Sequence, residues 1–502
     1  MRYLLGIDLG TSGCKALLMD EKGKIIAKNM KTYPTEQPFP GWSEQSPEDW
    51  YQAVCAAIRG VVQTGGVSAK DVVSLAVSGQ MVGLVAVDRD WKPIRPCILW
   101  NDQRSVRQAD SVLAKLGLDR IVEETGNVVF PSFFAPKILW MKENEPENYA
   151  RIKRVLFPKD YIVFRLTGEW ISEVSDFSGS CLMNVRKRTS SSVMMDAFAV
   201  KPSFLAPVLL ESEDAVGPLT GQAALDTGLS PQTLVGAGGG DQSCQAIGSG
   251  IVKPDRCGVT IGTSGVVFLQ TERYTQHPEG RIHAFRHSVR NQFYLMGVML
   301  SAGGSYQWLR RVLRHADGGF SYERMNGLAA QAPAGCDGLF FLPYLTGERC
   351  PHNDPYARGG WIGMTSTHEL PHLVRSVMEG ITFGLYDCLE LIKSLGNEVA
   401  AVYASGGAAA SGLWLQIISD VFDLPVCVTN ATEGAALGAA LLAGSAAGVF
   451  PSAADAAQNM IKVTRQYEPD SVGRELYRNG FPAYQAFYRS LKDDFHSMAG
   501  HA

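Results

Sequence analysis

The chain has 502 residues, of which 46% are hydrophobic and 19% are charged, and its formal net charge is −4. This composition is typical of a globular protein and excludes wholesale disorder, while the length favours two domains over a single core. Because 46 basic residues are balanced by 50 acidic ones, we expect neither nucleic acid nor an anionic membrane as a partner.

The cysteines and the N-terminal segment predict a cytoplasmic protein. Ten cysteines are scattered without a CxxC pair, and nine histidines show no HExxH or zinc-finger spacing. These patterns are typical of reduced thiols and predict no structural zinc. Asp8 interrupts the first apolar stretch, so no secretory signal is predicted, and the Ala/Gly-rich segment at 434–450 is too short to span a bilayer.

The first 30 residues predict three strands joined by turns. YLLGID, KALLMD and IIAKNM have the apolar character of strands, with GTSG at 10–13 and EKGK at 21–24 between them. A dinucleotide-binding loop or a Walker loop needs a helix directly after its glycines. The glycines at 10–13 therefore belong to a β-hairpin.

The rest of the chain alternates between helical and strand patterns, which predicts α/β layers. In the first half we expect helices at 47–64, 104–116 and 134–144, strands at 72–79 and 83–88, and a strand, a glycine tract and a helix within 233–250. In the second half we expect two strands around a turn at 257–270, a strand at 401–407, and helices near 303–315, 369–395 and 411–422. The residues after about 452 are expected to be mostly helical.

The turn GTSG occurs twice, at 10–13 and at 262–265, each time between two predicted strands. This recurrence some 250 residues apart suggests two lobes of similar design. We expect an N-terminal lobe at 1–247 and a C-terminal lobe at 248–502, with the last helices packing on either one.

Both turns are candidates for binding phosphate. Successive backbone N–H groups in a Gly-rich turn form a concave site for anions, and Thr and Ser hydroxyls add donors. Two such turns facing each other across a cleft would hold a polyphosphate from both sides. A tight hairpin explains either turn taken alone.

Only the first turn follows an acid, Asp8, since its counterpart in the second hairpin is Thr260. A carboxylate beside phosphates repels them unless a cation lies between, and Mg²⁺ binds one or two carboxylates together with waters and phosphate oxygens. Asp8 is therefore a candidate for organising Mg²⁺. The alternative is a hydrogen bond to its own turn, and Lys15 lies either near the phosphates or in solvent.

Asp241 and two glycines near 406 allow both a structural and a functional interpretation. Asp241 follows GAGGG and begins a predicted helix, so it is either a helix cap or an ionised base that takes a proton from a hydroxyl. Gly406 and Gly407 follow a strand and precede a helix. They either let a flat adenine ring lie against the backbone or supply the positive φ that the start of the helix needs.

A set of segments resembles one protein family, in order, over nearly the whole chain. They are GIDLGTSG, WSEQSPEDW, SGQM, ILWNDQR, LFPKDYIVFRLTGE, SDFSG, GGGDQ, IGTSG, FLPYLTGERCPHNDP and EGAALGAALLAG. GIDLGTSG is similar to the first phosphate motif of the actin/hexokinase-type ATPases. The whole set resembles the FGGY carbohydrate kinases, and within that family the xylulokinases most.

The resemblance implies two ribonuclease-H-like domains of the actin/hexokinase type flanking a deep cleft. It implies that the γ-phosphate of MgATP is transferred to a hydroxyl of a ketopentose. The substrate it implies above all is D-xylulose, with D-xylulose 5-phosphate as the product. It also implies that the chain forms a homodimer. Asp8 would organise the Mg²⁺ through water, and Asp241 would accept the proton. The residues implied to bind the nucleotide are Gly10, Thr11, Ser12, Gly262, Thr263, Ser264, Gly303, Gln307, Gly406, Gly407 and Ser411. Those implied for the sugar are Met81, Val82, Asp241 and Gln242, with Trp42, Asn101, Asp102 and Arg104 farther out.

Two positions, Val82 and Gln242, depart from the Gln-Met-His-Gly and Gly-Asp-Asn segments of the xylulokinases. Val82 cannot hydrogen-bond a sugar hydroxyl, and a hydroxyl left unpaired there would cost about 1–3 kcal/mol. Kinases for ribulose, other ketoses or glycerol-like polyols therefore stay open as alternatives. Two other classes are an actin- or chaperone-like ATPase without a sugar substrate, against which SGQM and GGGDQ argue, and a sugar-binding sensor, which needs neither Asp8 nor Asp241.

Overall fold

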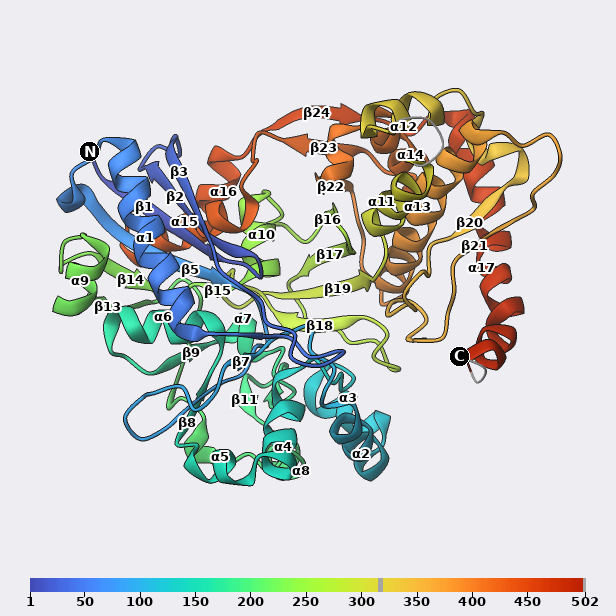
Figure 1. Cartoon of the computed structure of the whole chain (residues 1–502). Coiled ribbons are helices and arrows are strands. Elements are labelled where there is room, and N and C mark those ends of the chain that lie inside the picture. The colour runs from blue at the N-terminus through green and yellow to red at the C-terminus, as the bar shows by residue number, and fades with distance from the viewer. Residues whose placement is uncertain (315–318, 500–502) are drawn as a thin grey trace.

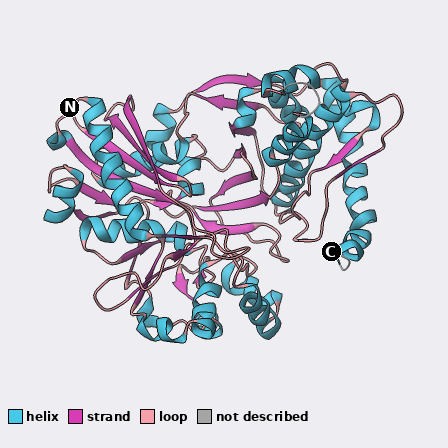
Figure 2. Ribbon diagram, in the orientation of Figure 1, coloured by secondary structure: helices cyan, strands magenta, loops and turns pink. Residues whose placement is uncertain are grey.

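The computed structural model of the chain describes residues 1–314 and 319–499. Two seven-stranded sheets form its frame, one from each half of the sequence. In Figure 1 the first sheet lies beside the N-terminus, with its strands from the first 80 residues in blue and its later strands in green, and the second sheet is green, yellow and orange. Helices flank both sheets in Figure 2, so the predicted α/β layers are confirmed.

The first sheet has β1 near its centre. Asp8 near the end of β1 pairs with Lys15 on antiparallel β2 and with Ser78 on parallel β5. The strand order is β13 (Ala215–Pro218), β14 (Leu234–Gly236), β5 (Val72–Gly79), β1 (Tyr3–Leu9), β2 (Gly13–Asp20) and β3 (Ile25–Thr32), with β15 (Gly239–Gly240) also on β5.

The second sheet repeats this arrangement around β16, which has β17 antiparallel on one side and β22 parallel on the other. Both GTSG turns therefore lie in hairpins, as predicted. The strand order is β18 (His283–Arg286), β19 (Phe293–Met299), β17 (Gly265–Thr271), β16 (Arg256–Ile261), β22 (Ala401–Gly406), β23 (Val426–Thr429) and β24 (Val463–Tyr467).

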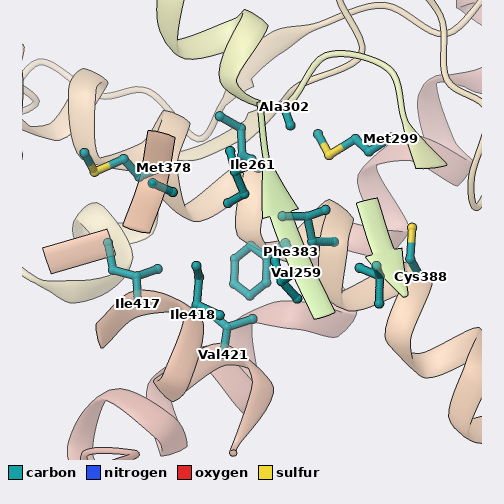
Figure 3. Close-up of a cluster of buried hydrophobic side chains, with 14 of the residues drawn as sticks. Val259, Ile261, Met299, Ala302, Met378, Phe383, Cys388, Ile417, Ile418 and Val421 are labelled. Carbon is teal, nitrogen blue, oxygen red and sulfur yellow. The ribbon is translucent and has the colours of Figure 1, made fainter. Parts of the chain in front are cut away.

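Each sheet has its own apolar core. In the second one, shown in Figure 3, Val259 and Ile261 of β16 lie among Phe383, Ile417 and Val421 from two helices. The helices on this side are α11 (Gly303–Leu313), α12 (Tyr322–Ala329), α13 (Leu370–Ser394), α14 (Gly412–Phe422) and α17 (Ser471–Ala499). Those on the first sheet are α1 (Pro47–Gly65), α6 (Pro158–Thr167), α9 (Gly221–Thr227), α10 (Asp241–Gly248), α15 (Gly434–Ala446) and α16 (Ala453–Met460).

Helix α15 comes from the second half of the sequence but packs on the first sheet, against β1, β5 and α10. Glycines allow this close approach, because a Cβ on Gly6 would lie 1.8 Å from the Ala436 carbonyl oxygen and one on Gly438 would lie 1.9 Å from that of Cys244. Helix α15 therefore fixes β1, which carries Asp8, relative to α10, which begins with Asp241. The lobe boundary at 247/248 stays a prediction.

A helical segment between β5 and β14 packs beneath both sheets in Figure 1. Its apolar side chains, such as Phe134 and Phe177, share a core with Phe285 and Met296 of the second sheet. Its helices are α2 (Val106–Leu116), α3 (Leu118–Thr125), α4 (Phe134–Asn144), α5 (Pro146–Arg151), α7 (Val174–Phe177) and α8 (Ser192–Ala197). The short strands of the chain are β4 (Glu44–Gln45), β6 (Val85–Val87), β7 (Cys97–Ile98), β8 (Arg154–Leu156), β9 (Ile171–Glu173), β10 (Met183–Asn184), β11 (Thr189–Ser190), β12 (Val208–Leu210), β20 (Phe340–Leu342) and β21 (Gly360–Ile362).

The predicted helices at 47–64, 134–144 and 369–395 are confirmed as α1, α4 and α13. The helix predicted at 303–315 is α11, and residue 315 lies outside the described residues. The sequence did not predict β24, which joins the second sheet after residue 452. Within 1–314 and 319–499, every helix is too short or too polar to cross a membrane.

Candidate active site

A cleft of about 870 Å³ is lined by both GTSG turns and by both candidate carboxyl groups. Gly10 from the first hairpin and Gly262 and Ser264 from the second border it, together with Asp8 and Asp241. The two turns lie about 250 residues apart in sequence, so the fold brings them to one space. This arrangement can hold an anion between N–H donors of two different sheets.

Asp8 is a partly buried acid that lines this cleft. Burial raises its pKa to about 6, while Lys15 on the paired strand and the Ser78 hydroxyl, 3.4 Å away, act in the opposite direction. A cation beside the carboxyl group would favour its ionised form. In the described parts of the chain no group of three or more His, Cys, Asp or Glu side chains could hold a metal. One or two carboxylates plus phosphate and water suit Mg²⁺, so the residues present fit that ion.

Asp241 is the first residue of α10, directly after Gly240 at the helix cap. Burial and, to a smaller extent, the nearby Asp8 carboxyl raise its pKa to about 7, although hydrogen bonds from Gln242 act in the opposite direction. A carboxyl group with a pKa near neutrality is suited to accept a proton at physiological pH. Asp241 also borders a second, smaller pocket.

This second pocket, of about 150 Å³, shares Asp241, Gln242 and Ser264 with the large cleft. Met81, Val82, Asp241 and Gln242, the four residues implied for the sugar, all line it. Its other lining residues are Trp100, Ser132, Phe133, Val266, His283, Phe285, Met296, Val298 and Arg349. The pocket is therefore built by both halves of the chain and has the size for a small molecule beside the cleft.

Val82 has a left-handed backbone, with φ of 57°, which a β-branched residue adopts only when its surroundings hold it there. Its N–H donates to Asp176 Oδ1 at 3.1 Å, and its carbonyl oxygen accepts from Lys137 Nζ at 2.8 Å. Both side chains are buried, and burial lowers the pKa of Lys137 to about 7. Two buried polar groups thus fix the backbone of the loop that lines the small pocket.

The structure places Trp42, Asp102 and Arg104 outside this pocket. Arg104 lies over the Trp42 ring at 3.7 Å and pairs with the buried Asp102 at 2.7 Å. Asp102 Oδ2 also accepts from the N–H of Ser43 at 2.6 Å. Arg104 and Asp102 thus pair with each other within the N-terminal half, and the Trp42 ring covers the guanidinium group. Trp42 and Asn101 line a separate surface hollow.

The far end of the cleft is formed by β22 and the turn after it. Gly406 lines it, and its φ of 80° lets the chain pass closely over Ile261, whose carbonyl oxygen would lie 2.4 Å from an added Cβ. Gly303 packs as closely on the second turn, because a Cβ added to it would lie 2.2 Å from the Gly262 carbonyl oxygen. Ser411 caps α14 by accepting from Trp414 N. The predicted nucleotide residues that do not line the cleft are Thr11, Ser12, Thr263, Gly303, Gln307, Gly407 and Ser411.

Sequence reasoning missed several lining residues. Glu433, directly before α15, pairs with Lys15 at 2.8 Å and with Lys28 at 2.7 Å, and it lines the large cleft with Lys15. Trp100 and Arg349 line the small pocket from loops far apart in the sequence. The segments ILWNDQR, GERCP and EGAALG contain three of these residues, but their spacing gives no sign of which side chains meet.

Two family models together match most of the chain. The N-terminal domain of the FGGY family of carbohydrate kinases matches residues 3–248, and the C-terminal domain matches residues 257–447. The chain belongs to the FGGY family of carbohydrate kinases. The resemblance predicted from the sequence segments is thereby confirmed, and so is a phosphotransferase that acts on an alcohol group.

Relatives within the FGGY family align over nearly their full length. The xylulose kinase of Bacillus subtilis is 38% identical, covering 98% of each chain, and that of Escherichia coli is 35% identical, covering 97% of this chain and 99% of its own. The crystal structure of a xylulose kinase from Brucella ovis has a TM-score of 0.92 at 34% identity, covering 98% of this chain and 100% of that one. The two-domain actin/hexokinase-type fold of this FGGY kinase is therefore confirmed.

Proposed function

We propose that this FGGY kinase transfers the γ-phosphate of MgATP to D-xylulose, giving D-xylulose 5-phosphate. The observation that carries the proposal is the shared position of Asp241, which lines both the cleft with the two GTSG turns and the small pocket beside it. A sugar hydroxyl held in the small pocket would lie beside Asp241, and the γ-phosphate in the cleft would lie on the other side of this residue. The xylulose kinases among its relatives support the choice of sugar.

Asp241 accepts the proton in this reaction. The sugar oxygen forms a bond to the γ-phosphorus, the bond from that phosphorus to the bridging oxygen of ADP breaks, and the hydroxyl proton passes to an Asp241 carboxyl oxygen. Phosphoryl transfer depends mainly on alignment and on neutralising charge, so a base of pKa about 7 at the reacting hydroxyl is sufficient. A sugar that fills the small pocket would displace water from the reacting hydroxyl.

The phosphates lie between the two hairpins in this proposal. Other backbone N–H groups of the two GTSG turns would donate to phosphate oxygens from opposite sides. The N–H groups of Gly10 and Gly262 close the turns themselves, since each donates to a carbonyl oxygen of its own turn. Asp8 and the Ser78 hydroxyl beside it would hold Mg²⁺ through water, and the ion, when bound, neutralises charge on the phosphates. Adenine would lie at the far end, against Gly406 and Tyr403.

The test is an ADP-release assay of the purified protein with MgATP and a panel of pentuloses, hexuloses, polyols and aldonates. We expect the highest kcat/KM with D-xylulose and little ADP release without a sugar. Because Val82 and Gln242 line the pocket, ribulose and glycerol are the informative competitors. A higher kcat/KM with another panel member refutes the choice of D-xylulose, and ADP release that no sugar stimulates refutes a sugar kinase.

Two further expectations belong with this proposal. A cytoplasmic location is supported by the ten cysteines, all of which are buried free thiols. A homodimer stays a prediction that light scattering of the purified protein tests.

A further inference from the structure

Trp100 joins the small pocket to the first GTSG turn. Its side chain lines the pocket, and its indole N–H donates to the Thr11 hydroxyl oxygen at 2.8 Å. Thr11 directly follows Gly10, which lines the large cleft. We propose that Trp100 is a positioning residue that couples sugar binding to nucleotide binding through this hydrogen bond. The inference builds on the proposed function, because it needs a sugar in one space and a nucleotide in the other.

The inner side of the turn is already fixed by a buried polar network. The carbonyl oxygen of Thr11 accepts from Gln45 Nε2 at 2.6 Å, and its hydroxyl lies 3.4 Å from Gln80 Oε1. Gln45 in turn accepts from Gln80 Nε2 and from Trp50 Nε1, each at 2.9 Å. Gln45, Gln80 and Trp50 are buried, so this side of the turn has little freedom. Trp100 is the contact to Thr11 on the pocket side.

Trp100 differs from these partners because 43% of its surface is exposed. It lies in the loop between β7 and α2, outside both sheets. A half-exposed indole ring retains rotational freedom, which lowers the average occupancy of a hydrogen bond made by its edge. The face of the ring is the part that a sugar in the pocket would cover, since the apolar C–H side of a sugar packs well against an aromatic face.

A bound sugar therefore acts on the turn without touching it. Once the ring is held by the sugar, its N–H points steadily at Thr11, and the turn N–H groups are fixed in the orientation that receives phosphate. The nucleotide then binds to a turn that is already ordered. Because it no longer bears the entropic cost of ordering the turn, it binds more tightly. Linkage requires that the nucleotide tightens sugar binding by the same factor.

The variant Trp100→Phe tests the inference because it keeps an aromatic face and removes only the N–H donor. Calorimetric titration measures the Kd of a non-hydrolysable ATP analogue, with Mg²⁺, in the presence and absence of saturating sugar, and the Kd of the sugar alone. We expect the sugar to tighten nucleotide binding about 5- to 20-fold in the wild type and less than about 2-fold in the variant. The Kd of the sugar alone should change less than about threefold.

The matched control is Trp170→Phe, a partly buried tryptophan in the same half of the chain whose N–H has no hydrogen-bond partner among the described residues. Trp170→Phe should retain the wild-type coupling. A second variant, Thr11→Val, removes the acceptor in place of the donor. If the bond carries the coupling, the double variant loses no more coupling than either single variant.

The outcomes separate this inference from the proposed function. Wild-type coupling retained in both Trp100→Phe and Thr11→Val overturns the role of Trp100, even if D-xylulose is the substrate. Nucleotide Kd values that are equal with and without sugar in the wild type overturn the coupling as well. If another sugar is the best substrate in the ADP-release assay, the titrations use that sugar, and the same criteria apply.

Discussion

The two GTSG hairpins have the same four residues and the same place in their sheets, but their surroundings differ. The first has a partly buried acid, Asp8, with Lys15 opposite it. In the second, Thr260 takes the position of the acid and shares a 2.8 Å hydrogen bond with Ser405. The first hairpin thus combines N–H donors with an acid and a lysine, which pairs with Glu433, and the second has neither charge at these positions. In the proposed function both turns bind the phosphates, and the acid two residues before the first turn places the cation on that side.

The largest effect is expected from Asp241, which both spaces share. Asp241→Ala should lower kcat about 10²- to 10⁴-fold, because a positioned base contributes about that much, while the Kd of the nucleotide changes little. Steady-state kinetics and nucleotide titration provide the two measurements. Turnover close to that of the wild type would remove Asp241 from the role of base.

The comparison of the hairpins predicts unequal effects at equivalent positions. Asp8→Asn should lower Mg²⁺-dependent kcat about 100-fold or more, because it removes the charge that faces the cation. Thr260→Ala, the matched change in the second hairpin, loses one hydrogen bond of about 0.5–1.5 kcal/mol and should lower kcat/KM less than about tenfold. Equal losses in the two variants would show that the hairpins are functionally equivalent. Thermal unfolding of Asp8→Asn checks that its fold is retained.

The second hairpin should be sensitive to packing instead of charge. In Gly303→Ala the new methyl group would lie 2.2 Å from the Gly262 carbonyl oxygen, so the turn must shift. Overpacking of about 1–3 kcal/mol at this turn should raise the KM for ATP about tenfold. Gly327→Ala in α12, where a Cβ meets nothing within 4 Å, is the control and should leave this KM unchanged. An unaltered KM in Gly303→Ala would separate the second turn from nucleotide binding.

The smallest effect concerns pH and stability. The folded-state pKa of Asp241 is about 7, above its ordinary value of 3.8, so the folded state binds this proton more tightly than the unfolded state. Stability therefore falls as pH rises from about 4 to about 7. Asp241→Asn should unfold a few degrees above the wild type at pH 8, and the difference should shrink as pH falls towards 4. Melting curves across this range measure it, and a lower midpoint for the variant at pH 8 contradicts the assignment.

Local sequence patterns predicted the parts of the site that lie next to a turn. The two hairpins, Asp8 and Asp241 follow from strands that end in glycines, because such ends leave backbone N–H groups and nearby acids at one edge of a sheet. Met81 and Val82 came from the family resemblance, and they line the pocket. Their backbone conformation was not predictable, since it depends on Asp176 and Lys137, far away in the sequence.

Contacts between distant segments could not be predicted. The position of α15 on β1 depends on the absence of a side chain at Gly6, some 430 residues away from Ala436. Trp100 and Arg349 reach the small pocket from loops, where no periodic pattern indicates a direction. Conversely, Asp102 and Arg104 lie in a segment that resembles the family, but they form an ion pair with each other and do not line the pocket.

The position of α15 also has a consequence for synthesis of the protein. A ribosome that has completed residue 247 has already made both acids of the site, but the helix that sets β1 against α10 is still almost 200 residues from being made. The nascent first half therefore leaves an apolar strip of β1 and β5 uncovered until residue 446 has emerged. Catalytic competence arrives late in translation, and a prematurely terminated chain would contain the reactive groups without holding them together.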